Sequence, residues 1–114
     1  MMKTLEDKYS AALDEESAAY DEANDAMLAA LKARANVAVA RVKDAEIRIS
    51  AAAAADDFNF AAVKEAVDKT DIKKLSFLAA LEVETTSISD KALAKVDAAE
   101  AKVAKLKAEL AKVA

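Results

Sequence analysis

The sequence predicts an all-α protein, a long antiparallel helical hairpin of the coiled-coil type with a short connecting helix at its tip. Three observations lead to this prediction. The 114 residues include no glycine and no proline, so tight turns are few and helices can be long. Apolar residues recur at helical spacing along two long segments. Acidic and basic stretches face each other when the chain folds back near residue 62.

The first predicted helix covers about residues 3–54. Its apolar residues mostly stand three, four or seven positions apart, the period of one buried helical face. A helix this long needs a partner along its length, and we expect the stripe to pack against the returning helix. The stripe comprises Tyr9, Leu13, Tyr20, Met27, Leu31, Ala38, Val42, Ala45, Ile49 and Ala52.

The stretch AAAAADDFNF, residues 51–60, marks the end of that helix. Asp56 and Asp57 are good N-cap residues, because a carboxylate accepts hydrogen bonds from the free N–H groups of a new helix. A short helix of about 57–69 should follow. Thr70 or Asp71 can cap the next helix.

The third predicted helix covers about residues 72–114. From Val96 onward its apolar residues alternate in steps of 3 and 4, a coiled-coil seam, whereas two steps of four around Ala92 predict a stutter. VETTSIS, residues 83–89, is poor helix-forming material, so both a continuous helix and a break near 84–89 remain open. The stripe comprises Leu75, Leu78, Leu81, Thr85, Ile88, Ala92, Val96, Ala99, Val103, Leu106, Leu110 and Val113.

Charge predicts the direction of pairing. Residues 1–26 hold two lysines against eight acids, a net charge of −6, and residues 99–114 hold four lysines against two acids, a net charge of +2. Residues 32–48 hold five basic residues against two acids, a net charge of +3. Residues 77–90 hold three acids and no base, a net charge of −3. An antiparallel hairpin places acid opposite base in both halves.

The composition excludes most catalytic chemistry. Without histidine or cysteine, the chain has no Ser-His-Asp or Cys-His constellation and no thiolate or imidazole metal site. We therefore expect no enzyme, no cofactor, no metal and no small-molecule substrate. The first residues lack an apolar run, and no stretch approaches the roughly 20 apolar residues of a membrane span. The expected location is the cytoplasm or a virion.

All three phenylalanines, Phe58, Phe60 and Phe77, fall at the predicted tip. One interpretation is a small core that supplies the bulk alanine lacks. The other is an exposed anchor that binds a partner protein.

A second apolar stripe on the first helix suggests self-association. A two-helix hairpin needs one buried face per helix, and this helix has nearly two. Either the connecting helix folds back over the second face, or another chain covers it. That chain is a second copy, in a homodimeric four-helix bundle, or another protein. The second stripe comprises Val37, Val39, Ala40, Ile47, Ala51 and Ala54.

We interpret the chain as a non-enzymatic helical protein–protein interaction protein, such as a small phage or bacterial accessory protein that is a virion or assembly component or inhibits a host protein. The net charge of −4 and the weakly hydrophobic alanine seam argue against nucleic-acid and membrane binding. One alternative is a de novo designed bundle without biological activity. Another is an acidic nucleic-acid mimic that blocks a basic partner.

Overall fold

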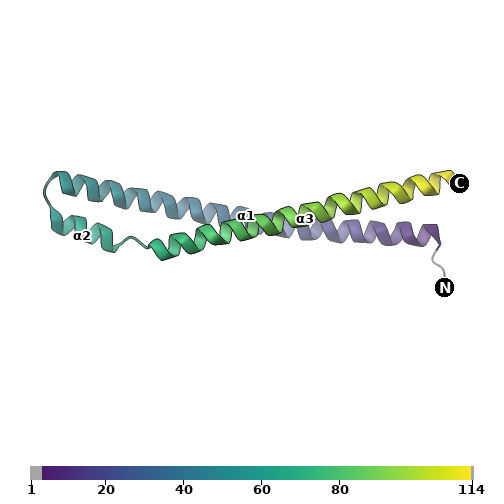
Figure 1. The fold of residues 1–114 in the computed structure, drawn as a ribbon, viewed down its shortest axis with the longest axis horizontal. Helices are drawn as coiled ribbons and strands as arrows, with labels where there is room; N and C mark the ends of the chain where they lie inside the picture. Colours follow the sequence, from purple (N-terminus) through teal and green to yellow (C-terminus); the bar gives the residue numbers. More distant parts are fainter. Residues whose placement is uncertain (1–3, 114) are drawn as a thin grey trace. The chain divides into compact units, whose positions relative to one another are not determined.

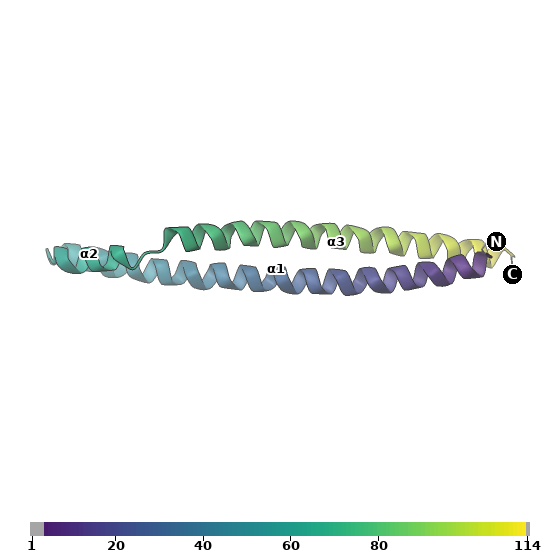
Figure 2. The same ribbon diagram turned by 90° about the horizontal axis from the view of Figure 1, so that it is seen from below.

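A computed structural model describes residues 4–113 of the chain. These residues form three helices, α1 (Leu5–Asp56), α2 (Phe60–Asp68) and α3 (Ile72–Val113), and no strand. The chain reverses direction between α1 and α3 by way of α2 (Figures 1 and 2). The predicted all-α hairpin with a short connecting helix is therefore confirmed. The helix ends predicted at residues 3 and 114 lie outside the described residues.

The chain forms two compact units. The first unit comprises the residues up to Ala30 and those from Thr85 onward, and the second comprises Leu31–Glu84. Both α1 and α3 contribute to each unit, whereas α2 belongs wholly to the second.

In the first unit, the beginning of α1 runs antiparallel to the end of α3. Lys102 Nζ lies 2.9 Å from Glu15 Oε2, and Lys95 Nζ lies 3.0 Å from Glu22 Oε1. Residue numbers thus rise along α1 while they fall along α3. The buried cluster of this unit comprises Ala19, Ala23, Ala26, Ala92, Val96 and Ala99.

In the second unit, Arg34 of α1 lies opposite Glu82 of α3, with 3.9 Å between Arg34 Nε and Glu82 Oε1. This contact and the Glu15–Lys102 pair join residues of the predicted acidic and basic stretches, whereas Lys95 lies just outside the predicted basic stretch. Each exposed ion pair contributes only about 0–1 kcal/mol. The pairs therefore select direction and register, and stability must come from packing.

The buried face of α1 differs from the predicted stripe. Every buried or half-buried residue of α1 follows an unbroken alternation of steps of 4 and 3, the repeat of a coiled-coil seam. The expected stripe through Leu13, Tyr20, Met27, Val42 and Ile49 is exposed instead, and that prediction is wrong. The observed seam comprises Leu5, Tyr9, Ala12, Glu16, Ala19, Ala23, Ala26, Ala30, Ala33, Val37, Ala40, Asp44, Ile47, Ala51 and Ala54.

The seam of α3 follows the predicted one closely. Its one internal difference is at Ile88, which is exposed, while the neighbouring Ser89 is buried. With Ser89 in place of Ile88, the steps on either side of Ala92 become 3 and 4. The two consecutive steps of four predicted around Ala92 lie instead around Thr85, between Leu81 and Ser89. The helix is continuous through residues 84–89.

The corner between α1 and α2 is built on Phe58. This residue has φ = 56°, in the left-handed region that glycine usually occupies. Its N–H donates to Ala55 O (3.0 Å), and the N–H of Asn59 donates to Ala54 O (2.8 Å), the two hydrogen bonds of a Schellman motif. α1 thus ends without glycine.

Asn59 serves both helices at this corner. While its N–H closes α1, its side-chain Oδ1 accepts the N–H of Ala62 (3.2 Å) and caps α2. The expected caps Asp56 and Asp57 do not have this role, because α1 continues through Asp56. At the start of α3 the expectation is correct for Asp71, whose Oδ1 accepts the N–H of Lys74 (2.9 Å).

Candidate protein interaction surfaces

The two packed units hold small side chains inside and large ones outside. The buried apolar residues among those described are nine alanines and two valines, Val37 and Val96. The larger leucine, isoleucine, methionine and phenylalanine side chains of residues 4–113 are half-buried or exposed. Small seam residues let two helices pack closely, but each buries little apolar area. Much of the chain's hydrophobic surface therefore remains on the outside.

The largest exposed apolar set lies on α1, and we call it the outward stripe. By helical geometry Leu13, Tyr20 and Met27 lie roughly 80° around α1 from the centre of the alanine seam. Leu28, Val42 and Ile49 lie on the side of the helix opposite the seam. In the first unit the outward stripe comprises Leu13, Tyr20, Met27 and Leu28, and in the second Leu31, Val39, Val42 and Ile49. These residues include most of the stripe that the sequence suggested would pack within the chain.

Tyr20 in the outward stripe is also tied to α3. Its Oη donates a hydrogen bond to Glu100 Oε1. This hydrogen bond, with smaller contributions from desolvation and from the negative charges of Glu100, Glu16 and Asp97, raises the pKa of Tyr20 above its ordinary value of 10.0. The contact holds the ring at the edge of the helix pair.

The residues predicted to mediate self-association are divided between inside and outside. Val37 is 1% exposed, so it belongs to the core of the second unit and cannot meet another chain. Ala40, Ile47, Ala51 and Ala54 are half-buried seam residues. Only Val39, at 69% exposure, faces solvent. Spacing alone did not distinguish the two stripes, because alanine gives a weak hydrophobic signal even where it is fully buried.

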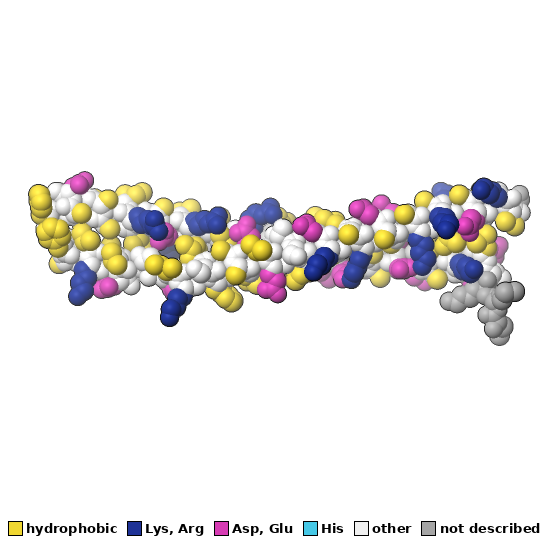
Figure 3. Space-filling model, in the orientation of Figure 1, with side chains coloured by type: hydrophobic (Ala, Val, Ile, Leu, Met, Phe, Trp, Pro, Cys, Tyr) yellow, Lys and Arg dark blue, Asp and Glu magenta, His cyan; other side chains and the backbone are white. Residues whose placement is uncertain are grey.

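The three predicted tip phenylalanines are all exposed, Phe58 at 79%, Phe60 at 68% and Phe77 at 65%. They form no core within the described chain, so the first of the two interpretations is wrong. Phe58 and Phe60 meet edge to face, with ring centroids 6.5 Å apart. Phe77, on α3, makes no ring contact among the described residues. Hydrophobic side chains are visible at the α1–α2 corner (Figure 3).

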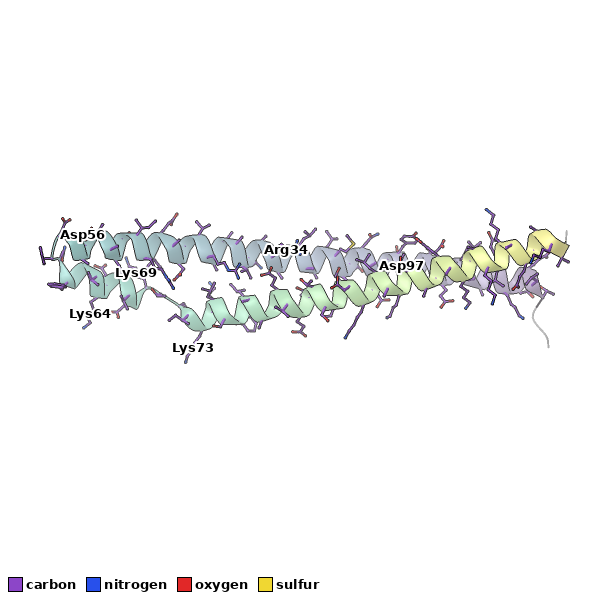
Figure 4. All side chains as sticks on the ribbon, turned by 45° about the horizontal axis from the view of Figure 1, so that its top comes forward. Arg34, Asp56, Lys64, Lys69, Lys73 and Asp97 are labelled. Atoms are coloured by element: carbon purple, nitrogen blue, oxygen red, sulfur yellow. The ribbon has the colours of Figure 1, made fainter. Side chains whose placement is uncertain are left out.

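A groove of ≈ 570 Å³ lies between the end of α1 and α2. Lys69, labelled in Figure 4 at the end of α2, borders it and lies 3.6 Å from Glu65 (Nζ to Oε1). Two lysines and two glutamates balance in charge around the groove, so it favours neither an anion nor a cation. Its lining comprises Lys43, Glu46, Ile47, Ser50, Ala62, Glu65, Ala66 and Lys69.

Residues 4–113 contain no group of three or more acidic residues placed to hold a metal ion. None of their helices is apolar enough over a sufficient length to span a membrane. No family model matches the chain, and comparisons with curated proteins and with solved structures found no match either. The functional argument therefore depends on the surfaces described above.

Proposed function

We propose that the chain is a non-enzymatic helical interaction protein that associates with itself through the outward stripe of α1. The distribution of side-chain size supports this proposal. A monomer leaves seven aliphatic or thioether side chains and one tyrosine of a single helix in water, although the same helix buries mainly alanine. Large exposed apolar side chains gathered on one helix are typical of protein–protein interfaces.

The apolar area that a partner would cover also supports self-association. At about 25 cal/mol per Å² of apolar surface, covering the exposed half of a leucine or isoleucine side chain contributes about 1 kcal/mol. The alanine seam offers much less per residue, so a partner that covers the outward stripe stabilises the helices more effectively than the intrachain seam can.

Sedimentation velocity over a range of protein concentrations tests the proposal. The wild-type chain should sediment increasingly as a dimer when concentration rises. Leu31→Glu places a charge in the outward stripe and should keep the chain monomeric. Because Leu31 is outside the seam, circular dichroism should show that the variant remains helical.

Ala29→Glu is the matched control, since Ala29 is exposed on the same helix but lies about 160° around it from Leu31. It should dimerise like the wild-type chain. A wild-type chain that stays monomeric at every concentration contradicts self-association. Equal effects of the two substitutions would place the interface elsewhere.

The aromatic corner supports a second contact, with a different protein. Phe58 adopts a backbone conformation that costs a non-glycine residue roughly 1–2 kcal/mol, yet its ring contributes little burial to the fold. A ring held outward at such a cost, beside a second exposed ring, is suited to an apolar pocket on a partner.

Affinity capture from source cells tests this contact. A partner retained by the wild-type chain should be lost with both Phe58→Ala and Phe58→Gly, whereas dimerisation should be unchanged. Ile72→Ala, which alters another exposed apolar residue of the same unit, should retain the partner. A partner that remains bound to both Phe58 variants would exclude the corner as its binding site.

A further inference from the structure

We propose that a second copy of the chain covers the outward stripe and that its α1 runs in the opposite direction. The first-unit part of α1 in one copy then lies against the second-unit part of α1 in the other. This inference rests on the proposed self-association and adds its direction and register. Charge, unpaired ionic residues and the positions of large side chains support it.

The charge of α1 divides at the boundary between the two units. Residues 5–30 hold one lysine against eight acids, a net charge of −7. Residues 31–56 hold five basic residues against three acids, a net charge of +2. A parallel pair of α1 helices would place −7 against −7, whereas an antiparallel pair places −7 against +2 twice. Like charges at such distances repel, so the antiparallel direction is favoured.

One row of charged residues beside the outward stripe is not used within the chain. It comprises Asp14, Asp21, Asp25, Lys32 and Lys43, all exposed. Successive members are separated by 7, 4, 7 and 11 residues, each close to a whole number of helical turns, so they share one side of α1. Among the described residues none of them makes an ion pair, in contrast to Glu15 and Glu22, which bind lysines of α3.

This row becomes complementary in an antiparallel pair. The two-fold axis of such a pair brings the same side of both helices together, so the aspartates of one copy lie along the lysines of the other. Opposing residue numbers have a constant sum in an antiparallel pair. A sum of 55 places Leu13 opposite Val42 and Met27 opposite Leu28, and the pairs Asp14–Lys43 and Asp25–Lys32, which sum to 57, then lie within one helical turn of each other. Large apolar side chains of the two copies then meet at these two pairs.

Disulfide trapping tests the direction, and the native chain has no cysteine to interfere. Leu13→Cys and Val42→Cys are made as separate single variants of the full chain. Each variant alone should form little covalent dimer under mild oxidation, since its cysteine faces an apolar residue of the other copy. When the two variants are refolded together, a disulfide between the two introduced cysteines should appear in roughly half of the dimers, the statistical share of mixed pairs.

Asn36→Cys is the matched control. Asn36 is exposed on α1 but lies about 120° around the helix from Val42. Refolded with Leu13→Cys, it should give no more covalent dimer than either variant alone. Equal crosslinking in this mixture would mean random collision and would overturn the inference.

The other outcomes separate the inference from the proposed function. Efficient covalent dimers from Leu13→Cys alone and from Val42→Cys alone would show a parallel pair, and would overturn the direction while leaving self-association intact. A dimer in sedimentation without any of these disulfides would place the interface elsewhere. A monomer in sedimentation would overturn both, and would leave the outward stripe for a different protein.

Discussion

Phe58 shows how a chain without glycine makes a sharp corner. The Schellman motif needs a residue in the left-handed region, where a side chain beyond Cβ is crowded by the backbone. Asparagine is the usual substitute for glycine there, and Asn59 is adjacent, but Asn59 is occupied as the cap of α2. The sequence indicated a corner at residues 51–60, whereas the identity of the left-handed residue had no sequence signal, because phenylalanine is not typical of that conformation.

Phe58→Gly should stabilise the fold. It removes a conformational cost of roughly 1–2 kcal/mol and adds an unfolded-state entropy of about 0.5–1 kcal/mol, so the free energy of unfolding should rise by about 0.5–1 kcal/mol. Phe58→Ala, which also removes the ring but keeps Cβ, should not stabilise. Urea denaturation of the three chains measures the difference. A glycine variant less stable than the alanine variant would contradict the assigned backbone conformation.

Ionisation of Tyr20 should lower the stability of the folded chain in alkaline solution. Its pKa is raised in the folded chain by the hydrogen bond to Glu100. The contribution of this contact is therefore complete below the ordinary tyrosine pKa of 10.0 and is lost as pH rises through the higher folded-state value. The melting temperature should fall more steeply above pH 10 for the wild-type chain than for Tyr20→Phe.

The pKa itself can be followed through the ultraviolet absorbance of the phenolate. Tyr9→Phe leaves Tyr20 as the only tyrosine of the chain. Adding Glu100→Gln should lower the pKa of Tyr20, since the carboxylate that stabilises the protonated form is removed. An unchanged titration would mean that Glu100 does not hold Tyr20 in solution.

At the scale of the element, α1 and α3 differ in how well their buried seams can be predicted from the sequence. The seam of α3 could be predicted because leucine and valine occupy most of it. Nine of the fifteen seam positions of α1 are alanine, and Glu16 and Asp44 are polar, so the larger residues of the outward stripe drew the prediction to the wrong face. An uninterrupted 4-3 alternation from Leu5 to Ala54 was the signal that could have found the seam. The role of Asn59 as a cap was also readable in principle, because asparagine is among the preferred N-cap residues.

Enlarging the α1 seam should destabilise the helix pair. Ala23 is buried in the core of the first unit, and Ala23→Leu should lower the free energy of unfolding by about 1–3 kcal/mol through overpacking. Ala29→Leu is the matched control, because Ala29 is exposed on the same helix and alanine and leucine are both good helix formers. Chemical denaturation of the two variants compares them. Equal stability would mean that the seam has room for large side chains.

At the scale of the whole molecule, the hairpin followed from patterns that involve distant segments. The complementary charges of residues 32–48 and 77–90 correctly indicated which stretches pair, and the Arg34–Glu82 contact lies within them. The same patterns could not separate contacts within one chain from contacts between chains, because both satisfy the same charges and the same helical period. Burial in the folded structure was needed to make that distinction.

Self-association should depend on salt. Attraction between the acidic and basic parts of α1 is screened at high ionic strength, where the Debye length falls to about 3 Å in 1 M salt. The double variant Lys32→Glu with Lys43→Glu should raise the dimer dissociation constant roughly tenfold in low salt and much less in high salt. Sedimentation equilibrium at two salt concentrations measures the change. A variant that dimerises like the wild-type chain in low salt would argue against an ionic contribution.

The double duty of Asn59 makes the α1–α2 corner intolerant of changes in length. One residue supplies the N–H that closes the first helix and the carboxamide that opens the second. A single residue inserted on either side of Asn59 would separate these two hydrogen bonds. Only three residues join α1 to α2, so the connection cannot accommodate the insertion. Elsewhere a surface turn commonly accepts added residues at little cost, but here even one extra residue should undo both helix ends together.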